Sequence, residues 1–151
     1  MTTRRKILFT LATGALAPWS TLAQAQSQSQ TPTRIRRIGW IIPQDLAGAN
    51  APWIAALRLG MAELKWVEGR DYQIDIRSAR SAQDLPGIAD ELVASQPDLL
   101  FAPGDVGVRL FMQRTKTLPI VFAISVDPVG NGLIASLQRP GGNATGMTNL
   151  V

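Results

Sequence analysis

The sequence contains neither cysteine nor histidine, and these two absences remove several classes of chemistry. Without cysteine there is no thiol nucleophile, no disulfide and no lipid attached through a lipobox cysteine. Without histidine there is no imidazole base, so a Ser-His-Asp triad is excluded, and the usual zinc ligands are missing as well. The carboxylates show no pair at a spacing typical of acid–base catalysis. We therefore expect a protein that is not an enzyme and that uses no metal and no cofactor.

The positive charge is also scarcer than the composition suggests. There are 15 Lys and Arg against 11 Asp and Glu, but three of the basic residues are Arg4, Arg5 and Lys6, and removing them leaves 12 against 11. Arg34, Arg36 and Arg37 form the remaining cluster, in what reads as a linker before the first strand. No G-x-G-x-x-G or G-x-x-x-x-G-K-[ST] follows a predicted strand. We expect neither a nucleic-acid partner nor a nucleotide site.

The first 25 residues are typical of an export signal. A basic start is followed by a short apolar stretch over 7–17 and by Ala23-Gln24-Ala25, which matches an A-x-A cleavage site. We predict cleavage after Ala25 and a periplasmic location. The Arg4-Arg5 pair favours twin-arginine export, and a general secretory signal is the alternative. Residues 26–36 begin with a polar, low-complexity run and are predicted to form a disordered leader.

The rest of the chain alternates between strand and helix patterns. Apolar or alternating runs predict strands over 38–42, 72–77, 99–102 and 120–124, and apolar residues at helical spacing predict helices over 54–64, 85–93 and 104–112. The polar alternation over 72–77 places that strand at or near a sheet edge. Ser81 and Asp84 mark the start of the second helix. The pattern predicts an α/β fold, a Rossmann-like parallel sheet with helices on both faces.

Four groups of residues carry a resemblance to a known family. They are ALRLGM with VEGR (56–61, 67–70), LP with ELV (85–86, 91–93), LPIVF with DPVG (118–122, 127–130), and GLIASL with RPGGN and TG (132–137, 139–143, 145–146). In this order they resemble the ABC-transporter substrate-binding protein family that includes tryptophan- and phenylalanine-binding members. The resemblance covers 37–151.

The resemblance implies an exported protein of two Rossmann-like lobes that traps a small organic ligand, amino-acid-like in some members, and delivers it to an ABC permease in the inner membrane. On this reading residues 37–151 are the N-terminal lobe and the second lobe is absent, as in a truncated fragment or a genuine one-lobe protein. A ligand-sensing module for a membrane sensor is the alternative. The resemblance also implies a short helix after the fourth strand, a turn at Pro140-Gly141-Gly142, and a fifth strand from Ala144 to Thr148.

Ligands of parallel sheets bind beyond the carboxyl ends of the strands, and three candidate contacts lie near the first of these ends. Gln44 and Asp45 follow the first strand, where the family contacts its ligand, although a solvated loop is the alternative. Trp53 opens the first helix and could stack on a planar ligand or pack the helix end. Trp40 and Trp66 read as packing residues.

The remaining candidates follow the third and fourth strands. Gly104 and Asp105 stand at a helix N-terminus, where backbone N–H groups can receive an anionic group. The family usually has Thr or Ser at the position of Asp105, so a carboxylate there would favour a ligand with an amine; an N-cap role is the alternative. Asp127 either contacts a ligand ammonium or holds the following turn by accepting backbone N–H groups.

Overall fold

The computed structural model describes residues 34–43 and 50–149. All of the described residues belong to one compact unit. The predicted export signal, its cleavage after Ala25, and the candidates Gln44 and Asp45 lie outside the described residues. Among the helices that are described, none combines the length and the apolar character needed to cross a bilayer.

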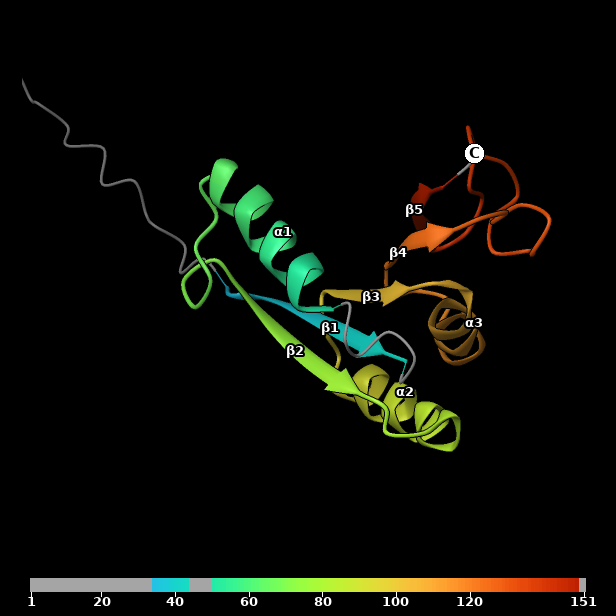
Figure 1. The fold of residues 1–151 in the computed structure, drawn as a ribbon, viewed down its shortest axis with the longest axis horizontal. Helices are drawn as coiled ribbons and strands as arrows, with labels where there is room; N and C mark the ends of the chain where they lie inside the picture. The colour runs from blue at the N-terminus through green and yellow to red at the C-terminus, as the bar shows by residue number, and fades with distance from the viewer. Residues whose placement is uncertain (1–33, 44–49, 150–151) are drawn as a thin grey trace, which may run out of the picture. The chain divides into compact units, whose positions relative to one another are not determined.

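Five parallel strands form one sheet in the order β2-β1-β3-β4-β5 (Figure 1). The strands are β1 (Arg36–Ile42), β2 (Tyr72–Ser78), β3 (Leu99–Pro103), β4 (Ile120–Ser125) and β5 (Ala144–Thr148). All four pairings between neighbours are parallel, which confirms the predicted sheet and the predicted fifth strand. β2 lies at the edge, as its alternating pattern predicted, whereas the apolar strand β1 is interior.

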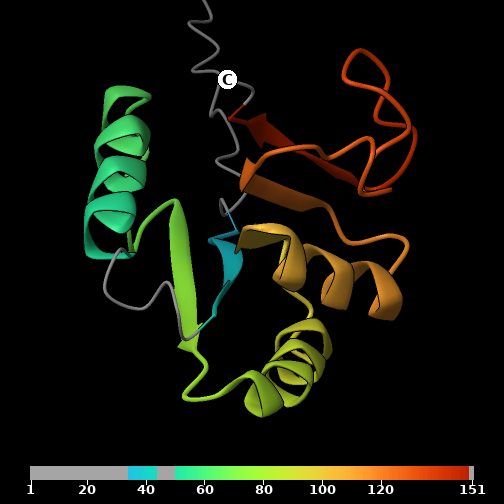
Figure 2. The same cartoon turned by 45° about the vertical axis from the view of Figure 1, so that its right-hand side comes forward.

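Within the described residues, three α-helices and one short 3-10 helix lie between the strands. They are α1 (Asn50–Glu63), η2 (Ala82–Asp84), α2 (Leu85–Ala94) and α3 (Asp105–Arg114). Figure 2 shows α1 on one side of the sheet and the pair α2 and α3 on the other. The predicted helix start at Ser81 and Asp84 is the start of η2, which leads directly into α2. The carboxylate of Asp84 accepts the backbone N–H of Ser81 at 3.1 Å, and Pro86 occupies the first turn of α2.

Side-chain alternation along the strands divides the apolar residues between the two faces of the sheet. Ile41, Leu100 and Phe122 face α2 and α3 and are at most 1% exposed, in one continuous core with Phe111 of α3. Trp40 and Phe101 occupy the opposite face, beneath α1, with their ring centroids 4.3 Å apart. The closed core therefore lies on the α2 and α3 side.

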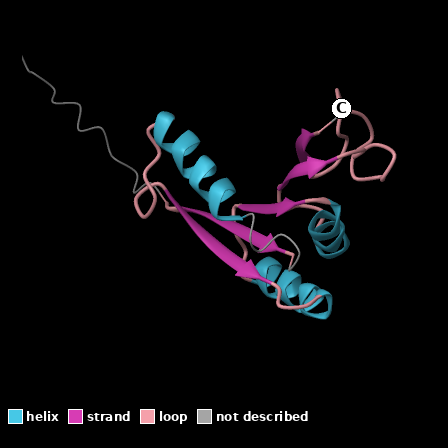
Figure 3. Ribbon diagram, viewed as in Figure 1, coloured by secondary structure: helices cyan, strands magenta, loops and turns pink. Residues whose placement is uncertain are grey.

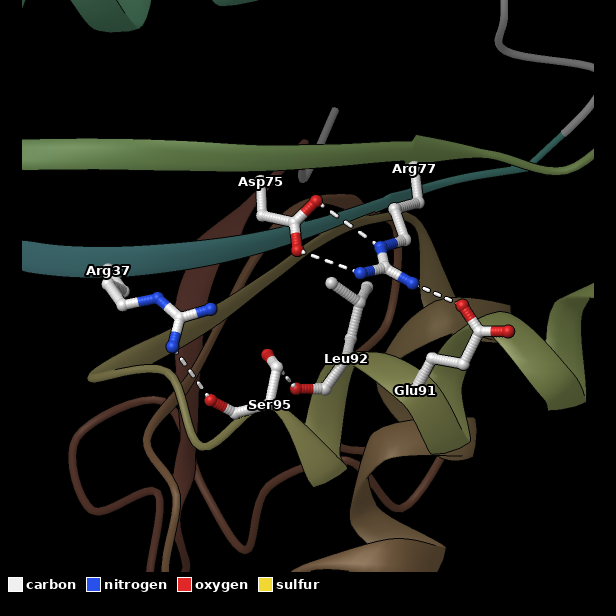
Figure 4. A network of polar contacts seen from close by, with 6 residues as sticks. All are labelled: Arg37, Asp75, Arg77, Glu91, Leu92 and Ser95. Atoms are coloured by element: carbon white, nitrogen blue, oxygen red, sulfur yellow. Dashed lines mark hydrogen bonds and ion pairs between the residues drawn. The ribbon is translucent and has the colours of Figure 1, made fainter.

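An ion network attaches the edge strand β2 to α2 (Figure 4). The guanidinium of Arg77 donates to Asp75 at 3.1 Å and to Glu91 of α2. Arg37 of β1 donates to the backbone oxygen of Ser95, just after α2, at 2.9 Å. These groups are partly exposed, so their contribution to stability is small. They also place charges along an edge strand, which hinders pairing with a strand of another chain.

The basic cluster before the predicted first strand needs a correction. Arg36 and Arg37 belong to β1, where they pair in register with β2, so the strand begins inside the leader predicted for 26–36. Asp98 explains why charged residues are accepted there. Its carboxylate accepts the backbone N–H of Arg37 at 2.9 Å and lies 3.1 Å from the Arg36 guanidinium and 3.2 Å from that of Arg34. Asp98 offsets part of the positive charge of the cluster, and the side chains of Arg34 and Arg36 remain 68% and 58% exposed.

Two further expectations were wrong. No helix forms after β4; residues 126–143 are turns and loop, as Figure 3 shows. A single turn from Asp127 ends at once because Gly132 takes a left-handed φ of 69°, and the N–H of Leu133 donates to the carbonyl of Pro128 in a Schellman-type closure. Trp66 is 40% exposed, so it is not a core packing residue, whereas Trp40 is 1% exposed, as predicted.

Candidate functional site

The candidate site lies at the carboxyl ends of β3 and β4, which a backbone hydrogen bond joins. Gly104 follows β3, and its backbone N–H donates to the carbonyl of Ala123 in β4 at 2.8 Å. Its φ of 73° is one that residues with a Cβ resist, which explains a glycine at this position. This geometry turns the chain directly into the first residue of α3, Asp105, with Gly104 itself in the N-cap position.

Asp105 forms the central polar contact of this edge. Its Oδ2 accepts a hydrogen bond from the side-chain amide of Asn131 at 2.6 Å, which links the start of α3 to the loop after β4. A carboxylate in the first turn of a helix is also favoured by the helix dipole. The other oxygen, Oδ1, is buried and has no hydrogen-bond partner among the described residues. Gly104, and not Asp105, is the N-cap, and Oδ1 of Asp105 accepts no hydrogen bond from the part of the chain that the structure describes.

Asp127 holds the turn that follows β4. Its Oδ1 accepts the backbone N–H of Gly130 at 2.7 Å, and its carbonyl accepts the N–H of Asn131 at 2.9 Å. The carboxylate lies so close to Gly130 that a Cβ on that residue would collide with it. Asp127 thus holds the turn, which is one of the two roles that the sequence left open. Through Asn131 the turn of Asp127 and the helix start at Asp105 form one connected unit.

Sequence reasoning missed an irregularity at the end of β4. Ile124 has φ of 63°, a conformation that a β-branched residue rarely adopts, and the pairing with β5 changes register between Phe122 and Ser125. The carbonyl of Ser125 accepts the hydroxyl of Thr148 at 2.7 Å, which secures the two strand ends. Strained backbone of this kind is concentrated at ligand sites. No local signal marks Ile124, and Asn131 stood out only as part of a glycine-rich segment.

Trp53 contributes to a different surface. It lines a groove of about 650 Å³ between α1 and the sheet, together with Trp40 and Phe101. The same groove reaches the carboxyl ends of β3 and β4 at Pro103 and Ile124. The structure thus brings Gly104, Asp105 and Asp127 to neighbouring loops, and places Trp53 in the adjoining groove. Among the described residues no group of three or more acidic side chains is arranged to hold a metal ion.

Comparisons with known proteins point to one family. The family model described as ABC transporter substrate binding protein matches residues 54–151. A tyrosine-binding protein of Clostridioides difficile (strain R20291) is 33% identical over 85 residues, which are 54% of this chain and 24% of that protein.

Solved structures agree with this match. A domain from Streptococcus pneumonia in complex with L-Trp has a TM-score of 0.67 and 25% identity, over 76% of this chain and 38% of its own. A ligand-free, open substrate-binding protein with adhesive properties from Clostridium difficile has a TM-score of 0.70 and 24% identity, over 78% of this chain and 40% of its own, and shows the fold alone. The chain thus spans less than half the length of each of these relatives.

Proposed function

Because the chain belongs to the family of ABC transporter substrate-binding proteins, we propose that residues 37–151 form the N-terminal ligand-contacting lobe of an exported, non-catalytic solute-binding protein. In this proposal the protein acts in the periplasm, and a second lobe closes over the carboxyl edge of the sheet. Hinge closure around the ligand then creates the form that an ABC permease recognises. The export signal predicted for residues 1–25 supports this location independently.

The observation that carries the proposal is the buried Oδ1 of Asp105, which accepts no hydrogen bond from any described residue. A polar group that is buried without a partner is unfavourable, and a ligand donor would remove that penalty. It stands at the carboxyl edge of a parallel sheet, where such folds bind ligands. The relatives described as binding tyrosine and as containing L-Trp suggest an amino-acid-like ligand. A carboxylate at the helix start attracts the ammonium of such a ligand and repels its carboxylate.

Three compounds that share an indole ring test this assignment by titration calorimetry on the purified native gene product. L-Trp carries both charged groups, tryptamine only the amine, and indole-3-propionate only the carboxylate. We expect the amine-bearing compounds to bind and indole-3-propionate to bind at least tenfold more weakly. Asp105→Asn should weaken the amine-bearing ligands by about ten- to hundredfold, the loss associated with a hydrogen bond to a charged group.

Glu63→Gln is the matched control, since it removes an exposed carboxylate at the far end of α1 without touching the candidate site. It should leave binding unchanged. If indole-3-propionate binds as well as tryptamine, the role given to Asp105 is wrong. If no amino acid or amine binds, or if a ligand is chemically converted, the proposed function itself fails.

A further inference from the structure

The loop after β4 carries the one Asn-Gly pair of the sequence, Asn131-Gly132. Both residues are exposed. Asparagine is a thermolabile residue, and it is most labile before glycine, because glycine has no Cβ to hinder the approach of its backbone nitrogen to the side-chain amide. The side chain of Asn131 is therefore a candidate for covalent modification at the edge of the sheet where the candidate site lies.

The reaction to which such a pair is prone is deamidation. The backbone nitrogen of Gly132 attacks the side-chain carbon Cγ of Asn131 and gives up its proton, a C–N bond forms, and the side-chain amide nitrogen leaves as ammonia. The cyclic imide that results takes up a molecule of water and opens at one carbonyl to aspartate or at the other to isoaspartate. Water is the co-reactant, so the reaction requires neither an oxidant nor a reductant.

The structure holds both reacting groups in other contacts. The N–H of Gly132, whose proton must be lost, donates to the carbonyl of Val129 at 2.9 Å. The amide nitrogen of Asn131, which must leave, donates to Oδ2 of Asp105 at 2.6 Å. The backbone N–H of Asn131 is also engaged, by the carbonyl of Asp127 at 2.9 Å. Attack on Cγ therefore requires that the turn opens and that the side chain leaves Asp105.

The contact with Asp105 contributes most to this restraint. Its acceptor is a carboxylate, and hydrogen bonds to charged groups are about twice as strong as those between neutral groups. It also joins the exposed loop to α3, an element 26 residues away in the sequence, so it fixes the side chain to the folded part of the molecule. The turn bonds to Val129 and Asp127 lie within the loop and would open with it.

We propose that Asn131 is a site of spontaneous deamidation and that Asp105 protects it. The reaction proceeds from the open turn, so its rate follows the fraction of molecules in which the turn has opened. The product has an ionised carboxylate in place of the amide donor, and this carboxylate cannot donate to Asp105 and repels it. The modified protein thus loses the link between α3 and the turn and gains a negative charge at the candidate site. This inference does not depend on the ligand assigned to that site.

Ageing of the purified native gene product at mildly alkaline pH tests the proposal. Peptide mass spectrometry follows the fraction of amide converted to acid at each asparagine, and chromatography separates the aspartate and isoaspartate peptides. Asn143 is the internal control. Its side-chain amide is also held, by the carbonyl of Leu118 at 2.8 Å, but the next residue is Ala144, whose Cβ hinders the attack. Position 131 should accumulate acid, and position 143 should convert more slowly.

Two replacements of Asp105 test the protective contact. Asp105→Ala removes the acceptor, and conversion at position 131 should become at least tenfold faster, the smallest factor expected for the loss of a hydrogen bond to a charged group. Asp105→Asn keeps an acceptor oxygen and should accelerate the reaction far less. Equal rates in the native and Asp105→Ala proteins would overturn the protective role. A slower reaction in Asp105→Ala would overturn it as well, because the carboxylate would then promote the attack.

Unfolding of the native protein in guanidinium chloride gives a measurement that does not depend on how the variants fold. Position 131 should convert at least tenfold faster in the unfolded chain than in the folded protein, because no turn then holds the reacting groups. Equal rates in the two states would overturn the proposal. An unfolded chain in which position 131 converts no faster than Asn143 would overturn it too, because the pair would then not be labile.

Asn131→Asp reproduces the charge of the product and tests its consequence. The backbone amides of Asn131 and Gly132 lie in the turn, and in this variant positions 131 and 132 should exchange hydrogen faster than in the native protein. Asn131→Ser is the matched control, because it shortens the side chain without adding a charge. If Asn131→Asp exchanges no faster than Asn131→Ser, charge repulsion by the product does not open the link.

Discussion

Replacement of Gly107 by alanine measures how closely α3 packs on the sheet. Gly107 is buried, and a Cβ there would lie 2.8 Å from the Cβ of Ala102 and 2.9 Å from Cγ2 of Ile41. Apolar carbons in contact normally keep about 3.5–4.0 Å, so α3 would have to move outward by roughly 1 Å. Overpacking of this kind costs about 1–3 kcal/mol. The displaced helix would also move Asp105 away from Asn131.

Gly87→Ala supplies a matched reference for this change. Both glycines are the third residue of a ten-residue helix, so the gain in helix propensity is similar in the two variants. At Gly87 the new Cβ meets nothing within 4 Å, and we expect the free energy of unfolding to rise by about 0.5–1 kcal/mol. The difference between the two variants therefore isolates the packing effect, and Gly107→Ala should be the less stable by about 1–3 kcal/mol.

Urea unfolding followed by tryptophan fluorescence and by circular dichroism gives both free energies. The buried Trp40 reports on the sheet, and the dichroism reports on the helices. Two variants that agree within about 0.5 kcal/mol would refute the reasoning, because the helix would then move off the sheet at no energetic cost. A lower stability for Gly87→Ala would contradict the assumption that its side chain enters open space.

Three other outcomes follow from the polar contacts. Gly130→Ala should open the turn after β4, because the new Cβ would displace the Asp127 carboxylate. The backbone amide of Asn131 should then exchange its hydrogen faster. An unchanged exchange rate would contradict this prediction. Asp105→Ala should lower the free energy of unfolding by about 1 kcal/mol through loss of the Asn131 bond, whereas Asp105→Asn should retain most of it. The Arg37 backbone N–H, then the Arg36 and Arg34 guanidinium groups, lower the pKa of Asp98. The stabilising effect of Asp98 should therefore be fully present above about pH 4, which is the pKa of an aspartate in the unfolded chain. It should be lost as the pH falls through the lower pKa that Asp98 has in the folded protein. Urea unfolding between pH 6 and 3 should show a weaker decline for Asp98→Asn, and an equal decline would contradict the role of Asp98.

The correct parts of the sequence prediction share a local origin. The apolar run of β1, the alternation of β2 and the helical stripe of α2 each require only a repeat of two or of about 3.6 residues. The start of η2 at Ser81, just before α2, requires a contact with Asp84 across three residues. Such patterns are complete within a few turns of chain, so the parallel sheet, its edge strand and the helices could be expected before the structure was known.

The errors arose where the local structure depends on a specific contact or dihedral angle. Arg34, Arg36 and Arg37 read as a linker because Asp98, their partner, is about sixty residues away. The family resemblance implied a helix after β4, but Gly132 closes the single turn from Asp127 immediately. Each case depended on one contact or one dihedral angle that composition and periodicity do not encode.

The sequence by itself determined the α/β class and the order of strands and helices, and it predicts which edge of the sheet a ligand would contact. Those features follow from local periodicity and from the geometry of parallel sheets. Only the tertiary structure decided that Asp105 meets Asn131 across 26 residues and that Ile124 adopts a left-handed conformation. It also decided that α1 leaves an apolar groove open above the sheet. The physical reason is that these properties belong to pairs of segments, and each pair forms only after the sheet has brought its members together.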